Sequence, residues 1–342
     1  MCPGRGAQGP GVTEDETVLV TGAGGFVGRH LIEYLLARNQ RVIALDINLD
    51  GIRHLHDRPG LRLVETDIRS HESVAPLIRQ AGLVFHLAAA HLQVGVDDDY
   101  YHSINVTALE NMLQVAAKSN TRRFVHCSTA GVYGDLATMP ADENTLCKPG
   151  IEYELTKLEG EEAVRSMVSS RGLSAIIIRP SWVYGPDCPR TLKLLRAISR
   201  RRFFFVGDGE NLRHPIYIAD LLSAFELAST VSEPSGETVI VAGPSALTTR
   251  ELVETIIRLL EIRYRPPTLP LGLVVIGCQL MEKAFAIAGQ QPPFSTRSIK
   301  FFTENSSFST RKAGELLGFE PTIGLDDGLS RTLRHARQRG LI

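Results

Sequence analysis

Short apolar runs alternate with amphipathic stretches along most of the chain. The runs that indicate strands span 17–20, 41–46, 61–66, 83–88, 122–128 and 174–180. Each is apolar nearly throughout and ends in polar or small residues, which is typical of strands covered on both faces of a parallel sheet. Between them, apolar positions recur at helical spacing over about 26–35, 73–81 and 104–119. The pattern predicts an α/β protein with a doubly wound parallel Rossmann sheet.

A glycine-rich segment, Thr21 to Gly28, directly follows the first strand and precedes the first helix. Glycines let a strand turn sharply and let backbone N–H groups approach a pyrophosphate at the positive end of the following helix. An ordinary glycine-rich turn is the alternative, but the order of strand, loop and helix favours a dinucleotide site. The candidate cofactor contacts in this segment are Gly22, Gly25, Phe26, Val27 and Gly28.

Ligands of such folds lie beyond the carboxyl ends of the strands. Asp46 ends the second strand, 18 positions after Gly28, near the spacing at which an acidic side chain accepts hydrogen bonds from ribose hydroxyls. A carboxylate there would repel a 2′-phosphate, so the residue favours NAD over NADP, although a solvated aspartate at a strand end is the alternative. Further candidate cofactor contacts at strand ends are Asp67, Ile68, Leu87, Ala88 and Ala89.

Composition narrows the class of partner. The 342 residues include 37 Lys and Arg against 38 Asp and Glu, so charge does not favour nucleic acid. Arg200 to Arg202 precede Phe203 to Phe205, which we interpret as a short buried strand. The five cysteines lack CxxC pairing, so we expect no disulfide framework and no metal site, and a reducing, cytoplasmic compartment. Residues 1–15 are rich in glycine, proline and charge and indicate a disordered tail.

The only candidate for membrane contact is the apolar segment 269–288. Gln279, Glu282 and Lys283 interrupt it short of the ~20 apolar residues that a membrane span needs. We therefore expect no integral span. A buried or substrate-covering helix is the favoured interpretation, and an interfacial helix is the alternative.

Tyr153 and Lys157 lie four residues apart, which places both on one face of a helix. Two hydroxyl residues, Ser128 and Thr129, end the strand that precedes them. A tyrosine with a pKa of about 10 acts as a base near pH 7 only if its phenolate is stabilised by about 4 kcal/mol. An adjacent ammonium supplies part of this, and a hydroxyl can hold the substrate oxygen. A surface tyrosine beside a lysine is the alternative to this catalytic interpretation.

Four segments together resemble the extended short-chain dehydrogenase/reductases, closest in pattern to 3β-hydroxysteroid and sterol dehydrogenase-like members. They are the TGxxGxxG loop, the segment Ser128 to Gly134, the pair Tyr153 and Lys157, and the segment Arg179 to Pro186. The resemblance implies a hydride-transferring enzyme with NAD as cofactor. It also implies that Thr129 is the catalytic hydroxyl, with Ser128 beside it as second choice.

The resemblance extends to other residues and to organisation. It implies that Asn105 shapes the backbone of the active site, and that Pro180 and Val183 lie near the nicotinamide. We expect a homodimer through the helices at 104–119 and 153–169. We assign the cofactor domain to 16–185, with 214–242 returning to it, and the smaller substrate-binding region to 186–213 and 243–342.

The family includes both dehydrogenases of free alcohols and epimerases or dehydratases of nucleotide sugars. Trp182 occupies the position where sugar-nucleotide enzymes typically carry an asparagine that binds phosphate. Arg213 corresponds instead to an arginine that pairs with substrate phosphate in those enzymes, and Arg190 is a candidate second ligand. We favour hydride transfer at a secondary alcohol or ketone, with a nucleotide-sugar epimerase or dehydratase as the alternative. A cofactor-sensing protein is disfavoured because Tyr153 and Lys157 are both present.

Overall fold

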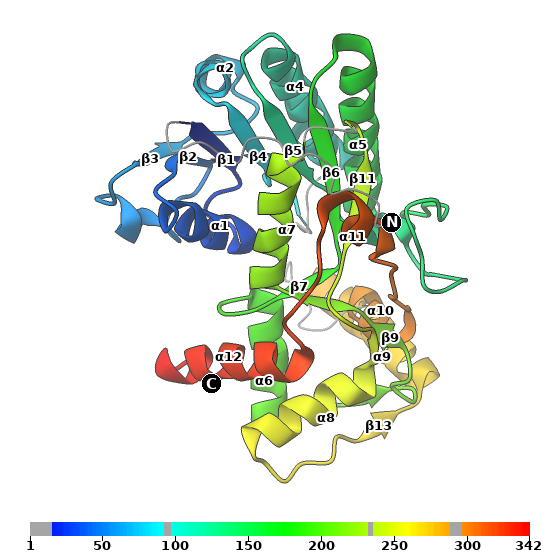
Figure 1. The fold of residues 1–342 in the computed structure, drawn as a ribbon. Coiled ribbons are helices and arrows are strands. Elements are labelled where there is room, and N and C mark those ends of the chain that lie inside the picture. The colour runs from blue at the N-terminus through cyan, green and yellow to red at the C-terminus, as the bar shows by residue number, and fades with distance from the viewer. Residues whose placement is uncertain (1–15, 92–96, 232–234, 288–295) are drawn as a thin grey trace, which may run out of the picture.

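A seven-stranded parallel sheet forms the centre of the computed structural model, which describes residues 16–91, 97–231, 235–287 and 296–342 (Figure 1). Its strands are β1 (Thr17–Thr21), β2 (Arg41–Asp46), β3 (Leu61–Glu65), β4 (Leu83–His86), β5 (Arg123–Cys127), β6 (Ala175–Pro180) and β11 (Thr238–Val241). They lie in the order β11-β6-β5-β4-β1-β2-β3, and every pairing is parallel. The predicted doubly wound Rossmann sheet is confirmed, and its strand order reverses between β1 and β4.

Helices cover both faces of this sheet (Figure 1). They are α1 (Phe26–Leu36) and α7 (Ile218–Thr230) on one face, and α2 (His71–Gln80), α4 (Leu109–Ala117) and α5 (Glu152–Arg171) on the other. Successive side chains of a strand point to opposite faces. Val18 and Val20 of β1 accordingly belong to the core under α1 and α7, whereas Leu19 belongs to the core under α2, α4 and α5.

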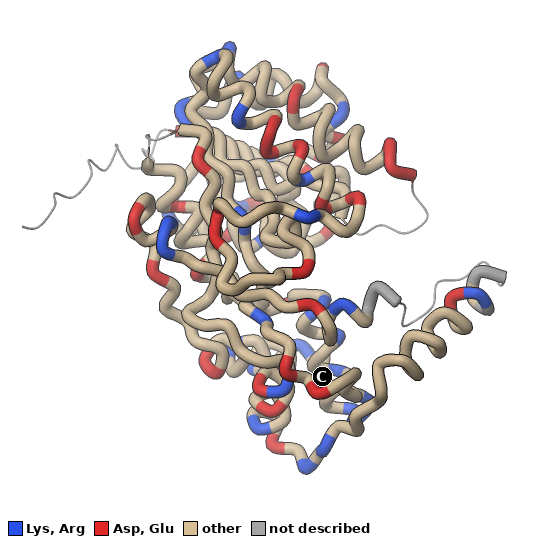
Figure 2. The backbone as a smooth tube through the Cα atoms, turned by 90° about the vertical axis from the view of Figure 1, so that its right-hand side faces the viewer, with Lys and Arg blue, Asp and Glu red and all other residues tan. Residues whose placement is uncertain are grey.

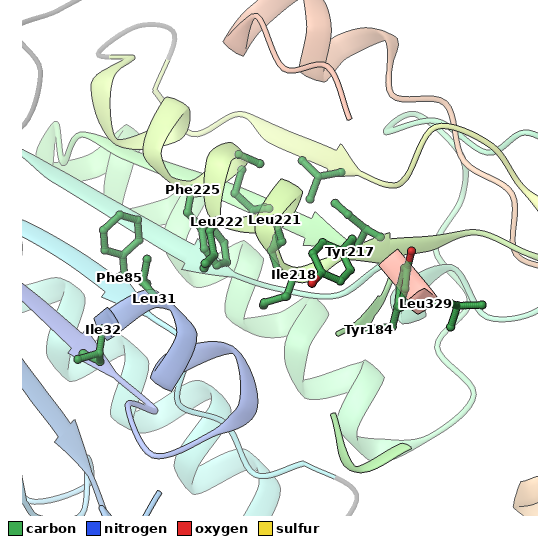
Figure 3. Packing of buried hydrophobic residues seen from close by; sticks show 14 of the residues in the cluster. Leu31, Ile32, Phe85, Tyr184, Tyr217, Ile218, Leu221, Leu222, Phe225 and Leu329 are labelled. Atoms are coloured by element: carbon green, nitrogen blue, oxygen red, sulfur yellow. The ribbon is translucent and has the colours of Figure 1, made fainter. Parts of the chain in front are cut away.

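Helix α7 joins the sheet to the second half of the chain. Its Phe225 packs against Phe85 of β4, with ring centroids 5.9 Å apart. Just before α7, Tyr217 packs edge to face on Tyr184, with centroids 5.4 Å apart (Figure 3). These two tyrosines end a small parallel pair formed by β10 (Pro215–Tyr217) and β7 (Trp182–Tyr184). One continuous core therefore extends from α1 into the second half of the chain.

The second half of the chain adds short strand pairs and helices, mostly below the sheet in Figure 1. Its elements are α6 (Pro189–Ser199), β8 (Phe205–Val206), β9 (Leu212–Arg213), β12 (Leu247–Thr248), α8 (Thr249–Leu260), β13 (Thr268–Leu269), α9 (Leu271–Ile287), α10 (Thr296–Thr303), α11 (Arg311–Leu317) and α12 (Leu325–Gln338). β8 pairs with β13 in parallel and β9 with β12 antiparallel. The expected phenylalanine strand is only partly right, because Phe203 is buried but the strand begins at Phe205.

The helix expected over 104–119 is not continuous. The chain forms α3 (Asp98–His102), then a π-helical turn over Ser103–Ala108, and then α4. A π-helical turn inserts an extra residue and re-aims the side chains that it carries, and such turns are frequent at functional sites. Asn105 lies within this turn. Short 3-10 turns over Arg53–Leu55 and Ala130–Tyr133 complete the described elements.

A buried ion pair ties α5 to the sheet. Glu161 of α5 is fully buried and accepts hydrogen bonds at 2.8 and 2.6 Å from the guanidinium of Arg179, which is itself buried on β6. A third guanidinium N–H donates to the hydroxyl of Tyr133 at 2.7 Å. The hydroxyl of Ser128, at the end of β5, donates to the same carboxylate at 2.5 Å. One carboxylate thus fixes α5, two strands and the turn after β5 relative to one another.

Replacement of Glu161 by alanine is expected to lower the free energy of unfolding by about 3–5 kcal/mol, because it leaves Arg179 charged and buried without its partner. The matched control is Asp327→Ala, which breaks the exposed pair between Asp327 and Arg331. Exposed pairs contribute at most about 1 kcal/mol. Urea denaturation of both variants measures the difference. Equal destabilisation by the two substitutions would contradict this assignment.

Candidate active site

The backbone of the glycine loop, Thr21 to Gly28, packs directly against neighbouring backbone. Gly22 has a φ of +71°, and a Cβ added there would lie 2.6 Å from the backbone nitrogen of Ala88. A Cβ on Gly28 would lie 2.0 Å from the carbonyl oxygen of Gly22. Gly25 is the N-cap residue of α1 and provides no side-chain cap, so the first-turn amides of α1 have no side chain over them. These features are what a pyrophosphate site at a helix N-terminus requires.

Asp46 faces this loop from the end of β2. Its carboxylate accepts hydrogen bonds from the backbone N–H of Gly24 at 2.9 Å and from that of Asn48 at 3.1 Å. A Cβ on Gly24 would lie 2.0 Å from the carbonyl oxygen of Asn48, so the loop and the end of β2 are in direct contact. The carboxylate is part of the cradle wall and leaves lone pairs that ribose hydroxyls can use.

A charged residue follows the end of β3, and small residues follow the end of β4. After β3, Asp67 pairs with the Arg69 guanidinium at 2.6 Å, and this hydrogen-bonded partner lowers the pKa of Asp67. Ile68 beside it is buried. After β4, Leu87, Ala88 and Ala89 are half-buried and leave the strand where the glycine loop touches it.

Asn105 joins the end of β4 to α5. Its side-chain oxygen accepts from the backbone N–H of Ala90 at 2.8 Å, and its amide donates to the Ala90 carbonyl at 3.2 Å. The amide also donates to the Thr156 hydroxyl at 3.0 Å. Asn105 is 2% exposed, so these bonds form out of water and hold the strand end at a fixed distance from the helix that carries Tyr153. This geometry supports the positioning role that the resemblance implies.

Tyr153 and Thr129 meet at the centre of the site. The Thr129 hydroxyl accepts a hydrogen bond from the N–H of Gly131 at 3.0 Å and lies close enough to the Tyr153 phenol to lower its pKa. Burial raises the pKa of Tyr153. The positive charge of Arg190 and the nearby Thr129 hydroxyl lower the pKa of Tyr153. The ligand-free site therefore holds a neutral phenol with a hydroxyl beside it.

Lys157 is 2% exposed, and its ammonium donates to the carbonyl of Cys127 at 2.6 Å. Burial lowers its pKa, while Cys127 and Glu161 raise it. The bond anchors Lys157 at the end of β5. In this structure the cation whose charge lowers the pKa of Tyr153 is Arg190. The sequence pattern instead assigns that effect to Lys157.

Two buried histidines lie on neighbouring strands within the field of Lys157. His86 of β4 and His126 of β5 stack with ring centroids 5.5 Å apart. Burial and the charge of Lys157 together lower the pKa of His86 to about 3 and that of His126 well below its usual value. Both rings are neutral at physiological pH, so Lys157 faces no competing buried cation on this side.

Ser128 and Thr129 are adjacent in sequence but face different surroundings. The Ser128 hydroxyl points into the interior, where it donates to Glu161. The Thr129 hydroxyl lies on the side of Tyr153, whose pKa it lowers. This arrangement favours Thr129 as the hydroxyl that meets a substrate, and it gives Ser128 a structural partner.

The substrate side of the site is aromatic. Trp182 of β7 packs edge to face on Phe301 of α10, with ring centroids 6.1 Å apart. Arg213 lies over the same Phe301 ring at 4.8 Å and donates to the carbonyls of Lys300 and Phe301. Burial, together with the charge of Arg190, lowers the pKa of Arg213 to about 10. Arg190 is exposed on α6 and so lies within electrostatic range of both Arg213 and Tyr153.

The remaining predicted contacts lie on strands beside this wall. Pro180 ends β6 opposite Val241, and Val183 of β7 pairs with Ile216. Sequence reasoning missed His91, whose ring packs edge to face on Tyr153 with centroids 4.8 Å apart, and it missed Phe301. The position of His91 directly after the small-residue end of the fourth strand was a usable signal. Phe301 lies over 100 residues from Trp182 and left no local signal.

A metal-binding cluster and a membrane-spanning helix are both absent from the described residues. No group of three or more His, Cys, Asp or Glu side chains within them is arranged to hold a metal ion. Within the same ranges, none of the helices has the length and apolar character needed to cross a membrane. The predicted tail, residues 1–15, lies outside the described part of the chain.

Fold and site are those of a dinucleotide-binding α/β protein with a Tyr and Lys pair. A family model, the NAD dependent epimerase/dehydratase family, matches residues 18–242, and the chain belongs to this NAD-dependent family. The resemblance to extended short-chain dehydrogenase/reductases, and NAD as the family's cofactor, are thereby confirmed.

Relatives fall into two groups. A 3beta-hydroxysteroid-dehydrogenase/decarboxylase isoform 1 of Arabidopsis thaliana is 27% identical, over 94% of this chain and 80% of its own. An uncharacterized UDP-glucose epimerase of Bacillus subtilis, YtcB, is also 27% identical, over 93% and 97%. Among solved structures, a UDP-glucuronic acid 4-epimerase from Bacillus cereus in complex with NAD has a TM-score of 0.77 at 23% identity, over 94% of this chain and 99% of that chain. The fold is shared, and the similarity leaves the reaction undecided between dehydrogenase and epimerase.

Replacement of Asp46 by alanine is expected to weaken NAD binding about tenfold and to improve NADP binding relative to NAD, since the carboxylate that would repel a 2′-phosphate is lost. The control is Asp50→Ala, which removes an exposed acid two residues beyond Asn48 that pairs with Arg53. Titration of both cofactors by calorimetry measures the change. An unchanged NAD to NADP ratio in the Asp46 variant would remove Asp46 from ribose recognition.

Proposed function

We propose that the protein is an NAD-dependent dehydrogenase or reductase that acts at a secondary alcohol or ketone carbon of an apolar, 3β-hydroxysteroid-like substrate. The observation that carries the proposal is the aromatic wall of Trp182 and Phe301, with Arg213 lying on Phe301 and bonded to backbone carbonyls. An arginine with these bonds has fewer N–H groups for a substrate phosphate. The plant relative named a 3beta-hydroxysteroid-dehydrogenase/decarboxylase adds support.

The cradle fits the cofactor, because side chains at Gly22 and Gly28 would collide with backbone where a pyrophosphate needs close approach. Gly22, Gly25 and the first turn of α1 would hold the phosphates, and Asp46 the ribose. Asp67, Ile68 and the residues Leu87 to Ala89 would line the cofactor's path. Pro180 and Val183 would lie at its nicotinamide end. When bound, NAD accepts or returns a hydride.

The chain's own residues handle the proton. Thr129 holds the substrate oxygen, and Tyr153 takes the hydroxyl proton during oxidation or donates its phenolic proton during reduction. Lys157 supplies positive charge from the side of β5. Because burial raises the pKa of Tyr153, the phenol is protonated near neutrality in the ligand-free protein. The resting site is therefore ready for the reductive direction, and oxidation depends on formation of the phenolate.

Replacement of Tyr153 by phenylalanine is expected to reduce turnover at least about a thousandfold while leaving NAD affinity within about threefold, since it removes the proton carrier and little volume. In the unmodified protein, oxidation should become faster as the pH rises, because the phenolate is the base, and reduction should become slower. Steady-state rates in both directions across pH test this. A Tyr153 variant with full activity would refute the mechanism.

The second candidate function is a nucleotide-sugar epimerase or dehydratase. Arg190 and Arg213 favour it, because their charges converge on the side of the site where a diphosphate would bind. The discriminating experiment asks whether purified protein retains NAD and needs none added. Retained NAD with turnover of UDP-glucose would favour an epimerase. Accumulation of NADH with a sterol alcohol would favour the dehydrogenase.

Trp182→Asn provides a matched variant for this choice. It restores the residue type typical of phosphate-binding relatives and removes the aromatic wall. We expect activity on an apolar alcohol to fall at least about tenfold through a higher KM, because a buried aromatic contact is lost. Leu194→Ala, on the neighbouring helix α6, controls for general loss of packing. Unchanged KM in the Trp182 variant would count against an apolar substrate.

We further propose that the substrate-binding region comprises 186–213 and 243–342, and that the protein forms a homodimer through α4 and α5 and works in a reducing, cytoplasmic compartment. The exposed Leu155 on α5 and the four described cysteines, all free, support these assignments. Analytical ultracentrifugation tests the dimer, and sedimentation as a monomer alone would exclude it.

A further inference from the structure

Helix α9 exposes large apolar side chains along one face. Leu273, Ile276 and Leu280 are 68%, 56% and 64% exposed, and their spacing places them on a single stripe of the helix. Val274 and Cys278, on the opposite side, are buried against the body of the protein. Leu269 and Leu271, at the start of the segment, are also exposed. We name these five leucine and isoleucine residues the α9 surface.

The α9 surface is not explained by packing within the chain. A helix that is apolar on all sides is normally buried all round. Here the inward side already provides the contacts with the core, so the outward side adds nothing to folding. It instead presents contiguous apolar area to solvent, and such areas mark binding surfaces. Of the interpretations that the sequence left open, a helix buried on all sides does not apply, whereas a substrate-covering helix and an interfacial helix both remain.

Arginines gather at the base of the same helix. β8 and β13 pair in parallel; Arg200 to Arg202 lie three to five residues before β8, and Arg263 and Arg265 lie at the matching positions before β13. The backbone bond from Phe205 N–H to the Pro267 carbonyl, at 2.8 Å, holds the two segments together. All five arginines are exposed, and none forms an ion pair with another described residue. Glu261 is the one acidic side chain between residues 261 and 265.

The arrangement of α9 suits an extended partner. Figure 2 shows α9 reaching away from the body of the protein, with basic positions on the chain below its base. A helix of 17 residues is about 25 Å long. Its exposed stripe is therefore longer than a pocket that holds one side chain. The helix is also too short to cross a bilayer. Apolar residues beside a cluster of arginines match the two layers of a membrane surface, acyl chains beneath anionic headgroups.

The α9 surface is also connected to the active site. The next helix, α10, packs against α9 and carries Phe301, which contacts Trp182 and Arg213. Val274 and Cys278 of α9 and Phe302 of α10 belong to one core cluster. An object bound at α9 therefore lies one helix away from the aromatic wall of the substrate side.

We propose that the α9 surface and the five arginines dock the protein on an anionic lipid bilayer, with α9 lying in the interface and not spanning it. Leu273, Ile276 and Leu280 enter the boundary between headgroups and acyl chains, while the arginines face lipid phosphates. In the docked protein the side that carries Trp182 faces the membrane, so an apolar alcohol reaches Trp182 without crossing water. This last link rests on the proposed function, whereas docking itself does not.

The test is flotation of the full-length protein with vesicles of phosphatidylcholine alone or mixed with phosphatidylglycerol, without substrate or NAD. We expect binding to the mixed vesicles that weakens with salt, since exposed charges are screened. The triple variant Leu273→Ser, Ile276→Ser, Leu280→Ser should lower the partition coefficient at least about tenfold on both vesicles. The double variant Arg201→Gln, Arg202→Gln should lower it about tenfold on mixed vesicles alone.

Matched controls separate docking from general stickiness. Leu146→Ser removes a leucine that is 73% exposed elsewhere, and Arg58→Gln removes an exposed arginine near β3; neither should alter flotation. If the triple variant fails to fold, as judged by circular dichroism, Leu273→Ser alone replaces it, with an expected loss of about threefold.

Three results would overturn the proposal. They are no flotation of the unmodified protein with either vesicle, an equal effect of the control substitutions, or a soluble oligomer that the triple variant dissociates while vesicles bind neither form. The last result would assign the α9 surface to a second copy of the chain. Because the assay contains no substrate, failure of the proposed reaction leaves flotation unchanged, and loss of flotation leaves the reaction intact.

Discussion

The buried carboxylate of Glu161 is the interaction on which the active site depends. It receives the guanidinium of Arg179 from β6 and the hydroxyl of Ser128 from the end of β5. Removing such charges from water costs several kcal/mol per ion, which only a complete set of partners offsets. The helix that carries Glu161 also carries Tyr153 and Lys157. The distance of Tyr153 and Lys157 from the strand ends is therefore fixed by the contact of Glu161, one to two helical turns further along α5.

Burial then determines the chemistry at rest. It raises the pKa of Tyr153 and lowers that of Lys157, so both groups are biased toward their neutral forms. The Cys127 carbonyl stabilises the Lys157 ammonium, and the neutral pair of His86 and His126 adds no further positive charge beside it. The protein thus keeps its proton on the phenol until a ligand changes the surroundings. Backbone contact joins the glycine loop to Leu87 and Ala88, directly after β4.

The candidate substrate side is built from different parts of the chain than the candidate cofactor site. The glycine loop consists mostly of backbone and small residues. The substrate wall consists of side chains from separate segments, including Trp182, Phe301 and Arg213. Helix α9 extends this apolar character to the surface. Under the proposed function, the choice between an apolar alcohol and a sugar nucleotide would depend on these long side chains, whose contacts lie outside the Rossmann core.

The sequence by itself determined the features that are local in the chain. The strand, loop and helix around Gly22, the acid at the end of β2 and the Tyr153 and Lys157 pair could all be predicted, because each depends on spacing within one or two adjacent elements. Tertiary structure alone decided that Ser128 faces Glu161, that His91 packs on Tyr153, and that Arg213 lies on Phe301. It also decided that 103–108 forms a π-helical turn and that α9 is half exposed. These outcomes arise where distant segments compete for the same space and the same hydrogen bonds, and no local pattern records which partner wins.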